Sequence, residues 1–174
     1  MEFDLNKSLE ILQGTPYVLE KQLCGLSREW LMQNEGEGTW NSAEIVCHLI
    51  QCEEEDWIAR MKIILNEEGN KKFMDFNRTK GFEKSKEKTI TELVSEFRML
   101  RKENLEYLES HMLTGSDLDK TGVHPDFGEV TLKQLLATWV VHDLSHISQI
   151  NRILAKQYRE EVGPWIEYLQ VLKK

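Results

Sequence analysis

Four long segments of the chain repeat their hydrophobic residues every three or four positions, the spacing of a helix that buries one side. They cover residues 5–22, residues 41–65, a segment that starts at Thr89 and a segment that starts at Thr131. No segment shows the sustained polar–apolar alternation of a half-buried strand. The pattern therefore predicts an all-α protein folded as a four-helix bundle.

Three of the four predicted helices begin with residues that cap a helix. In each case a polar residue precedes the apolar stripe and a Glu or Gln follows it three positions later, the arrangement of a capping box. The pairs are Asn41 with Glu44, Thr89 with Glu92, and Thr131 with Gln134.

The first helical segment contains an interruption at Gly14, Thr15 and Pro16. A proline that follows a capping threonine predicts that the helix restarts there instead of continuing.

The predicted helices are joined by residues 27–40, 66–88 and 113–130. The middle connection carries Phe73, Phe76 and Phe82, so we expect it to lie against the body of the protein. It is long enough to run back along a helix of about 36 Å, which permits helices two and three to run parallel. Residues 165–174 predict a short amphipathic helix at the end of the chain. No boundary divides the sequence, so residues 1–174 are expected to form one domain.

The composition narrows the class of protein. The chain has 174 residues, 40% of them hydrophobic and 30% charged, with a net charge of −8. This composition is typical of a globular domain and argues against a nucleic-acid partner bound through bulk electrostatics. No signal peptide or membrane span is apparent, and the three cysteines lack the spacing of a disulfide framework or a zinc knot. We expect a cytoplasmic protein with reduced thiols.

The most informative polar residues are histidines on predicted core faces. His142 and His146 are four residues apart and share the inward face of the last helix, while His48 lies on the inward face of the second. If these helices are neighbours, three imidazoles can converge and hold a divalent ion with open positions for water or substrate. Alternatively, each ring is a separate core histidine bonded to its own neighbour. The pair does not form a zincin HExxH motif, because Asp143 replaces the glutamate.

The sequence resembles the DinB/YfiT-like superfamily of metal-binding four-helix-bundle proteins from about residue 15 to residue 172. The resemblance rests on WNSAEIVCHL at residues 40–49, FGEVTL at 127–132 and LLATWVVHDLSHISQI at 135–150. It implies that His48, His142 and His146 bind a divalent metal such as zinc or nickel. It also implies an up-down-down-up topology and frequent homodimers.

For activity, the resemblance implies two reactions on a small-molecule substrate. The first is S-transfer from a low-molecular-weight thiol cosubstrate of the bacillithiol or mycothiol type, and the second is metal-dependent hydrolysis. Two alternatives stay open: a non-catalytic metal-binding protein induced by stress or DNA damage, and a helical partner-binding module without metal. The sequence identifies no catalytic residue.

Other residues carry weaker signals. Cys52 is a core filler, a soft ligand or a redox-active thiol, and Cys47 points to another face. Asp56 and Gln149 either orient an imidazole or are solvated. Glu53 or Asp56 is a candidate general base in a mostly solvated acidic run.

His111 is expected to be structural and His124 to be exposed in a loop. Trp57 and Trp139 belong either to the core or to a pocket wall. The basic residues of the middle connection either are solvated or attract an anionic substrate: Lys71, Lys72, Arg78, Lys80, Lys84, Lys86 and Lys88.

Overall fold

A computed structural model describes residues 2–173 of the chain. The helices are α1 (Leu5–Leu23), α2 (Arg28–Leu31), α3 (Ser42–Glu55), α4 (Trp57–Leu65), α5 (Lys84–Glu87), α6 (Ile90–Ser110), α7 (Gly115–Leu118) and α8 (Leu132–Lys156). Three short 3₁₀ helices, η1 (Lys80–Glu83), η2 (Gly163–Tyr168) and η3 (Gln170–Leu172), and two strands, β1 (Thr121–His124) and β2 (Gly128–Thr131), complete these elements.

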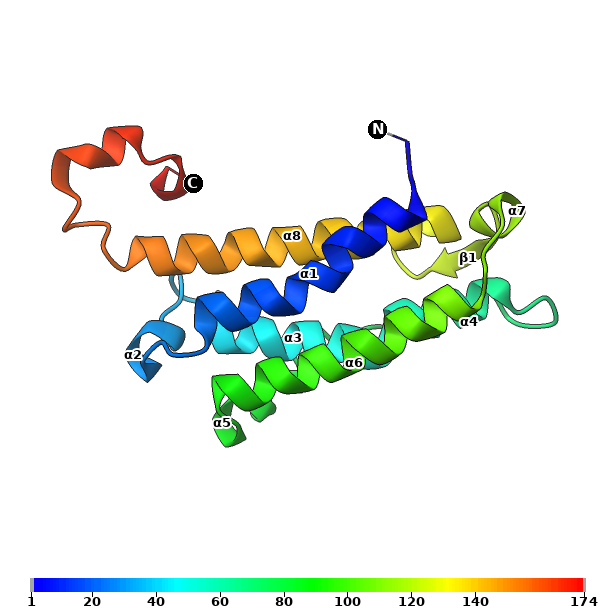
Figure 1. The fold of residues 1–174 in the computed structure, drawn as a ribbon, viewed down its shortest axis with the longest axis horizontal. Helices are drawn as coiled ribbons and strands as arrows, with labels where there is room; N and C mark the ends of the chain where they lie inside the picture. Colours follow the sequence, from blue (N-terminus) through cyan, green and yellow to red (C-terminus); the bar gives the residue numbers. More distant parts are fainter. Residues whose placement is uncertain (1, 174) are drawn as a thin grey trace.

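The four-helix bundle is formed by α1, the nearly continuous pair α3 and α4, α6, and α8 (Figure 1). Leu49 of α3 shares one hydrophobic cluster with Phe97 of α6, whereas Met61 of α4 shares the other with Leu108, so these helices run in the same direction. In Figure 1 α1 and α8 both run opposite to them. The topology is therefore up-down-down-up, as the resemblance implied and the length of the crossover permitted.

The connection between α4 and α6 crosses back along the bundle and packs on it. Phe73 is buried, and Gln51 of α3 holds the segment through two hydrogen bonds. Its Nε2 donates to the Asn77 carbonyl at 2.6 Å, and its Oε1 accepts from the Gly81 N–H at 3.2 Å. The expectation that this segment lies against the body is confirmed.

The predicted helix starts are confirmed by their capping boxes. At Asn41, Thr89 and Thr131 the side chain accepts from the third residue of the helix, whose own side chain accepts from the cap backbone N–H. These local interactions orient the first turns of α3, α6 and α8.

The predicted interruption of the first helix is wrong, because α1 continues through Pro16. Proline lacks the N–H that would bond to the Leu12 carbonyl one turn earlier. That carbonyl accepts instead from Arg101 Nη1 of α6 at 2.9 Å. A partner from a distant part of the sequence thus compensates for the missing bond, and the helix continues.

The predicted second helix is divided at Asp56, which separates α3 from α4 with φ −111° and ψ −76°. Helical hydrogen bonds continue on both sides, since Asp56 N–H donates to Cys52 O at 3.0 Å and Arg60 N–H donates to Asp56 O at 2.8 Å. The change in direction is therefore confined to one residue.

Two further expectations are corrected. The 113–130 connection contains most of an antiparallel hairpin, in which Thr121 pairs with Thr131 and His124 with Gly128. These strands have four residues each, too few for their alternation to stand out in the sequence. The C-terminal segment forms η2 and η3 in place of one amphipathic α-helix.

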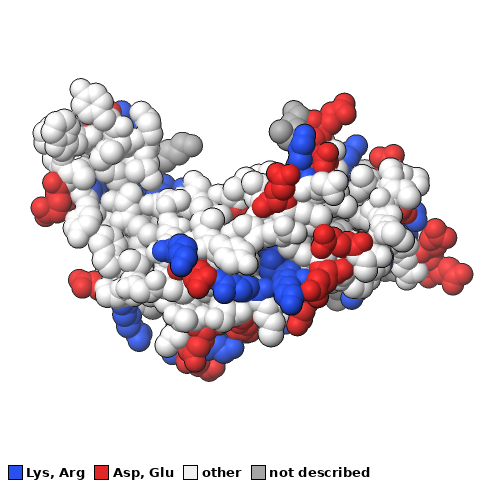
Figure 2. All heavy atoms as spheres, in the orientation of Figure 1, with Lys and Arg blue, Asp and Glu red and all other residues white. Residues whose placement is uncertain are grey.

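The surface carries acidic and basic groups side by side in the face drawn in Figure 2. Among the exposed ion pairs of the protein are Lys102–Glu106 and Arg98–Glu20. Within residues 2–173, none of the helices combines the length and the apolar character needed to cross a membrane.

Candidate metal centre

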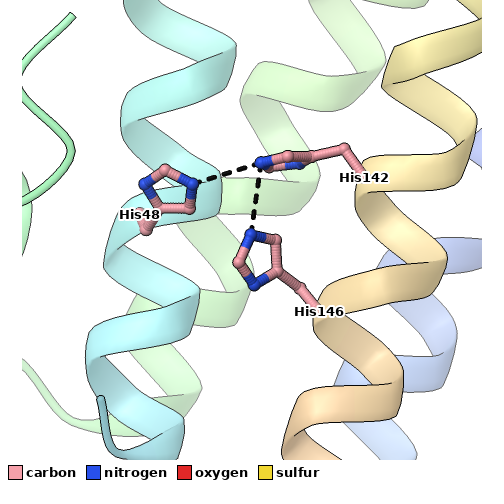
Figure 3. Close-up of side chains that lie close together, drawn as sticks. All are labelled: His48, His142 and His146. Atoms are coloured by element: carbon pink, nitrogen blue, oxygen red, sulfur yellow. Dashed lines mark hydrogen bonds between the residues drawn. The ribbon is translucent and has the colours of Figure 1, made fainter. Parts of the chain in front are cut away.

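The structure brings three histidine rings from two helices together. His48 projects from α3, and His142 and His146 project from successive turns of α8 (Figure 3). His142 Nε2 lies 3.2 Å from Nε2 of His48 and 3.2 Å from Nε2 of His146. One ligand atom from each residue lies within 4.8 Å of the other two. The two helices are therefore neighbours at the point where the sequence placed these rings.

The outer nitrogens of two rings are held by oxygen acceptors. His48 Nδ1 lies 3.2 Å from the Arg78 carbonyl, and His146 Nδ1 lies 3.0 Å from Gln149 Oε1. An acceptor at Nδ1 places the ring proton there and leaves the lone pair on Nε2. Both Nε2 lone pairs therefore face the shared centre. Nδ1 of His142 is buried without a hydrogen-bond partner among the described residues.

The rings are neutral at pH 7. Burial and the proximity of His146 lower the pKa of His48 to about 4, and burial with both other rings lowers that of His142 to about 2. Burial also lowers the pKa of His146. His142 has one ring proton and can donate it to only one of the two neighbouring Nε2 atoms. At least one of the two close Nε2–Nε2 contacts therefore has a lone pair on each atom and no proton between them. A donor set of this kind fits a metal cation.

Aromatic side chains enclose the rings. The Trp40 ring lies parallel to His146 with 6.1 Å between centroids, and Trp57 meets His142 edge-on at 5.1 Å. Phe76 of the crossover meets His48 at 5.9 Å. These contacts cover part of each ring and restrict the ring orientations.

The three histidines line a cavity of about 480 Å³. Trp57 and Leu135 contribute to its walls, the crossover contributes Phe73 and Phe76, and the β1–β2 hairpin contributes Phe127. Surveyed small-molecule sites have similar volumes and a similar mixture of apolar walls and a few polar groups. The rings therefore face a space that is large enough for a small substrate.

The structure separates the carboxylates that the sequence grouped together. Glu53 is buried and accepts from Arg101 Nη2 at 2.8 Å and from Trp139 Nε1 at 3.1 Å. It is neither solvated nor a pocket residue, so its interpretation as a general base is wrong. Asp56 lines the cavity and forms an ion pair with Arg60, and burial raises the pKa of its carboxyl to about 6.

Both cysteines of α3 are buried. Cys52 Sγ lies 3.6 Å from His48 Nε2 and lines the cavity, but it does not belong to the three-residue ligand group. Burial raises the pKa of its thiol, and burial raises that of Cys47 to about 12. Both groups are therefore protonated thiols at neutral pH.

The remaining histidines and tryptophans have distinct places. His111 caps α6 and its Nδ1 lies 2.8 Å from the Tyr107 carbonyl, a structural role. His124 lies in β1 and lines the cavity, so its expected position in an exposed loop is wrong. Trp57 stacks on Trp139 at 5.7 Å, and only Trp57 lines the cavity.

Most basic residues of the crossover are already paired. Lys71 donates to the Ile64 carbonyl at 2.8 Å, and the lysines beyond Arg78 form ion pairs: Lys80 with Glu55, Lys84 with Glu54 and Glu96, Lys86 with Glu83, and Lys88 with Glu96. Of the seven basic residues singled out, only Arg78 lines the cavity.

Sequence reasoning missed Arg60 and Arg101. Arg60 follows Asp56 by one helical turn, a spacing that could have indicated an ion pair. Arg101 interrupts the apolar stripe of α6 and is 1% exposed, which the stripe itself could have indicated.

The geometry agrees with the comparisons with known proteins. The chain matches the model of the DinB superfamily over residues 11–150 of its 174. None of the curated proteins matches the chain. Among solved structures it is similar to YfiT from Bacillus subtilis, described as a probable metal-dependent hydrolase with an unusual four-helix bundle topology. The two share 19% sequence identity with a TM-score of 0.75, over 87% of this chain and 86% of that one. At this identity the likeness shows the fold.

Proposed function

The chain belongs to the DinB superfamily, and from that premise we propose that it is a divalent-metal-dependent enzyme. His48, His142 and His146 would hold the ion, with zinc or nickel as candidates. The observation that carries the proposal is the meeting of three neutral Nε2 atoms at the wall of a cavity. Imidazole nitrogens suit zinc, nickel, copper and iron, and hydrogen bonds at Nδ1 of His48 and His146 orient two of the rings.

The reaction that we propose first is S-transfer from a low-molecular-weight thiol to a small electrophile. When bound, the metal supplies a Lewis acid that lowers the pKa of a coordinated thiol or water. The chain contributes the aromatic walls, which exclude bulk water, and a cavity of about 480 Å³ that accepts both reactants only if they are small. The resemblance to thiol-dependent members of the family supports this choice.

Hydrolysis is the second candidate. The observation that favours it is the description of YfiT as a probable metal-dependent hydrolase. The same three ligands and the same cavity would serve a bound water in place of a bound thiol, so the histidine geometry suits both reactions.

A purely structural ion would need a different environment. Structural zinc sites are closed by four protein ligands, whereas catalytic sites keep a position for water or substrate. Among residues 2–173, no Cys, Asp or Glu completes the group formed by the three histidines, and all three face the cavity. This arrangement favours the catalytic proposal over the structural alternative.

Metal binding is the first experiment. Tag-free protein stripped with a chelator is titrated with Zn²⁺ or Ni²⁺ in a calorimeter, and we expect one site per chain. His142→Ala should abolish that site and keep the helical circular-dichroism signal. His124→Ala is the matched control, since His124 lines the same cavity outside the ligand group. Absence of binding by the wild type, or equal loss in both variants, contradicts the proposal.

Turnover is the second experiment. The metal-loaded protein is assayed with a bacillithiol-type thiol and a small electrophile, and separately with activated esters. Thiol consumption that disappears in His142→Ala supports S-transfer, and ester cleavage that disappears supports hydrolysis. A folded His142→Ala protein with full turnover in either assay contradicts a metal-dependent reaction.

A further inference from the structure

A second charged site lies in the same cavity, two helical turns beyond His48. His48 and Cys52 of α3 and Asp56, which follows α3, are spaced by four residues, and all three line the cavity. Eight residues correspond to about 12 Å along a helix. Arg60 Nε lies 2.6 Å from Asp56 Oδ1, so its guanidinium turns back toward this end of the cavity.

The guanidinium of Arg60 is held in place but not saturated. Its side chain is 12% exposed, and its Cζ lies 5.1 Å from the centroid of the Phe73 ring. Asp56 lies beside the Nε edge, while Nη1 and Nη2 make no hydrogen bond among residues 2–173 and are not fully buried. An arginine has five N–H donors, so those on Nη1 and Nη2 remain free to bind an acceptor in the cavity. The unpaired Nη atoms belong to a residue that lines the cavity.

A neighbouring donor reinforces this end of the cavity. His124 lies against Phe73 with 6.2 Å between ring centroids, and its Nδ1 accepts from the Asp126 N–H at 3.1 Å, so its Nε2 carries the proton. Arg78 also lines the cavity, and its carbonyl lies at His48. Burial and the positive charges of Arg60 and Arg78 lower the pKa of His124, so its ring is a neutral donor. The carboxylates of Asp75 and Asp126 also line the cavity but lie on exposed residues.

We propose that Arg60 is the anion-recognition residue of the pocket and that the substrate is a small organic acid. Its carboxylate would bind Nη1 and Nη2 of Arg60, its hydrophobic body would lie between Trp57 and Phe73, and its reacting group would reach the histidine end. Paired N–H donors match the two oxygens of a carboxylate, and the ion pair with Asp56 keeps the guanidinium beside the cavity. This inference rests on the proposed function for the reacting end, but the acid-binding end is testable separately.

The test compares an acid with its neutral isostere. Binding of 3-phenylpropionate and of 3-phenylpropanamide to Zn²⁺-loaded protein is measured by calorimetry. We expect the wild type to prefer the acid by about tenfold or more, the size of a charge-assisted pair. Arg60→Gln should remove that preference and leave amide binding unchanged. Arg28→Gln is the matched control, because Arg28 is exposed on α2.

Two further variants keep the outcome decisive. His142→Ala should retain the preference for the acid, which separates carboxylate binding at Arg60 from carboxylate binding to the metal. Arg60→Lys keeps the charge but loses the paired donors, so we expect its affinity for the acid to fall several-fold. This variant tests the inference if Arg60→Gln does not fold. Equal affinity of the wild type for acid and amide, or an unchanged preference in Arg60→Gln or Arg60→Lys, overturns the inference. Failure of the zinc titration instead overturns the proposed function.

Discussion

Arg101 and Asp143 form a two-pronged ion pair in the centre of the bundle, with Nη1–Oδ2 at 2.6 Å and Nη2–Oδ1 at 3.0 Å. The same guanidinium donates to the Leu12 carbonyl of α1 and to Glu53 of α3, so one side chain joins all four long helices. Asp143 directly follows His142. The Arg101–Asp143 ion pair therefore also restricts the rotation of α8 at the turn that carries His142.

Replacing Arg101 should strongly destabilise the protein. Arg101→Met leaves Glu53 and Asp143 as buried carboxylates without their cation, and we expect a loss of about 3 kcal/mol or more in the free energy of unfolding. Urea denaturation followed by circular dichroism measures this change. Lys86→Met is the control, because the Lys86–Glu83 pair is exposed and screened by solvent, so its loss should change the stability little. Equal effects of the two substitutions would contradict the assigned role of Arg101.

Gln149 should increase metal affinity without binding the ion. Its Oε1 accepts from Nδ1 of His146, and removal of such a partner commonly weakens metal binding about 10- to 100-fold. We expect Gln149→Ala to raise the dissociation constant for Zn²⁺ by at least tenfold. Ser148→Ala, at the adjacent exposed position, should leave the constant unchanged. Calorimetric titration of both variants checks the expectation, which an unaltered constant for Gln149→Ala would refute.

The metal-free protein should lose stability as the pH falls. Because burial lowers the pKa of His48 from 6.5 to about 4, the unfolded chain binds more protons than the folded chain between these values. The His48 contribution is complete above pH 6.5 and declines toward pH 4, by up to about 3 kcal/mol. Asp56 acts in the opposite direction, since burial raises its pKa from 3.8 to about 6.

Urea denaturation at pH 7 and pH 5 in the presence of a chelator separates these effects. We expect the decrease between the two pH values to be smaller in His48→Gln than in the wild type. If both proteins lose the same free energy, His48 does not have the depressed pKa that its burial implies.

Gly122 should be required for the wall of the cavity. A Cβ at this position in β1 would lie 2.5 Å from Phe73 Cε1 and 2.9 Å from Ile64 Cγ1, closer than real contacts allow. Gly122→Ala should displace the Phe73 ring and cost about 1–3 kcal/mol. Gly115→Ala is the control, since a Cβ there meets no atom within 4 Å. Thermal denaturation compares the variants, and an unchanged midpoint for Gly122→Ala would contradict the close packing.

Local signals account for the successful part of the sequence analysis. Capping at Asn41, Thr89 and Thr131 depends on residues three positions apart, so the sequence alone reveals it. The shared face of His142 and His146 likewise follows from the period of one helix. The errors at Pro16 and Glu53 have a common origin in Arg101 of α6. Arg101 binds the Glu53 carboxylate directly, and it binds the Leu12 carbonyl that Pro16 leaves without a donor.

Helical periodicity and capping act over a few residues, so the amino-acid sequence was sufficient to identify the four helices, their inward faces and the pair of histidines on the last helix. The packing of the chain was needed to show that His48 meets that pair, that Asp56 and Arg60 line the same cavity, and that the hairpin and the crossover contribute to its walls. Contacts between residues far apart in the chain depend on how whole helices pack, and no local pattern specifies that packing.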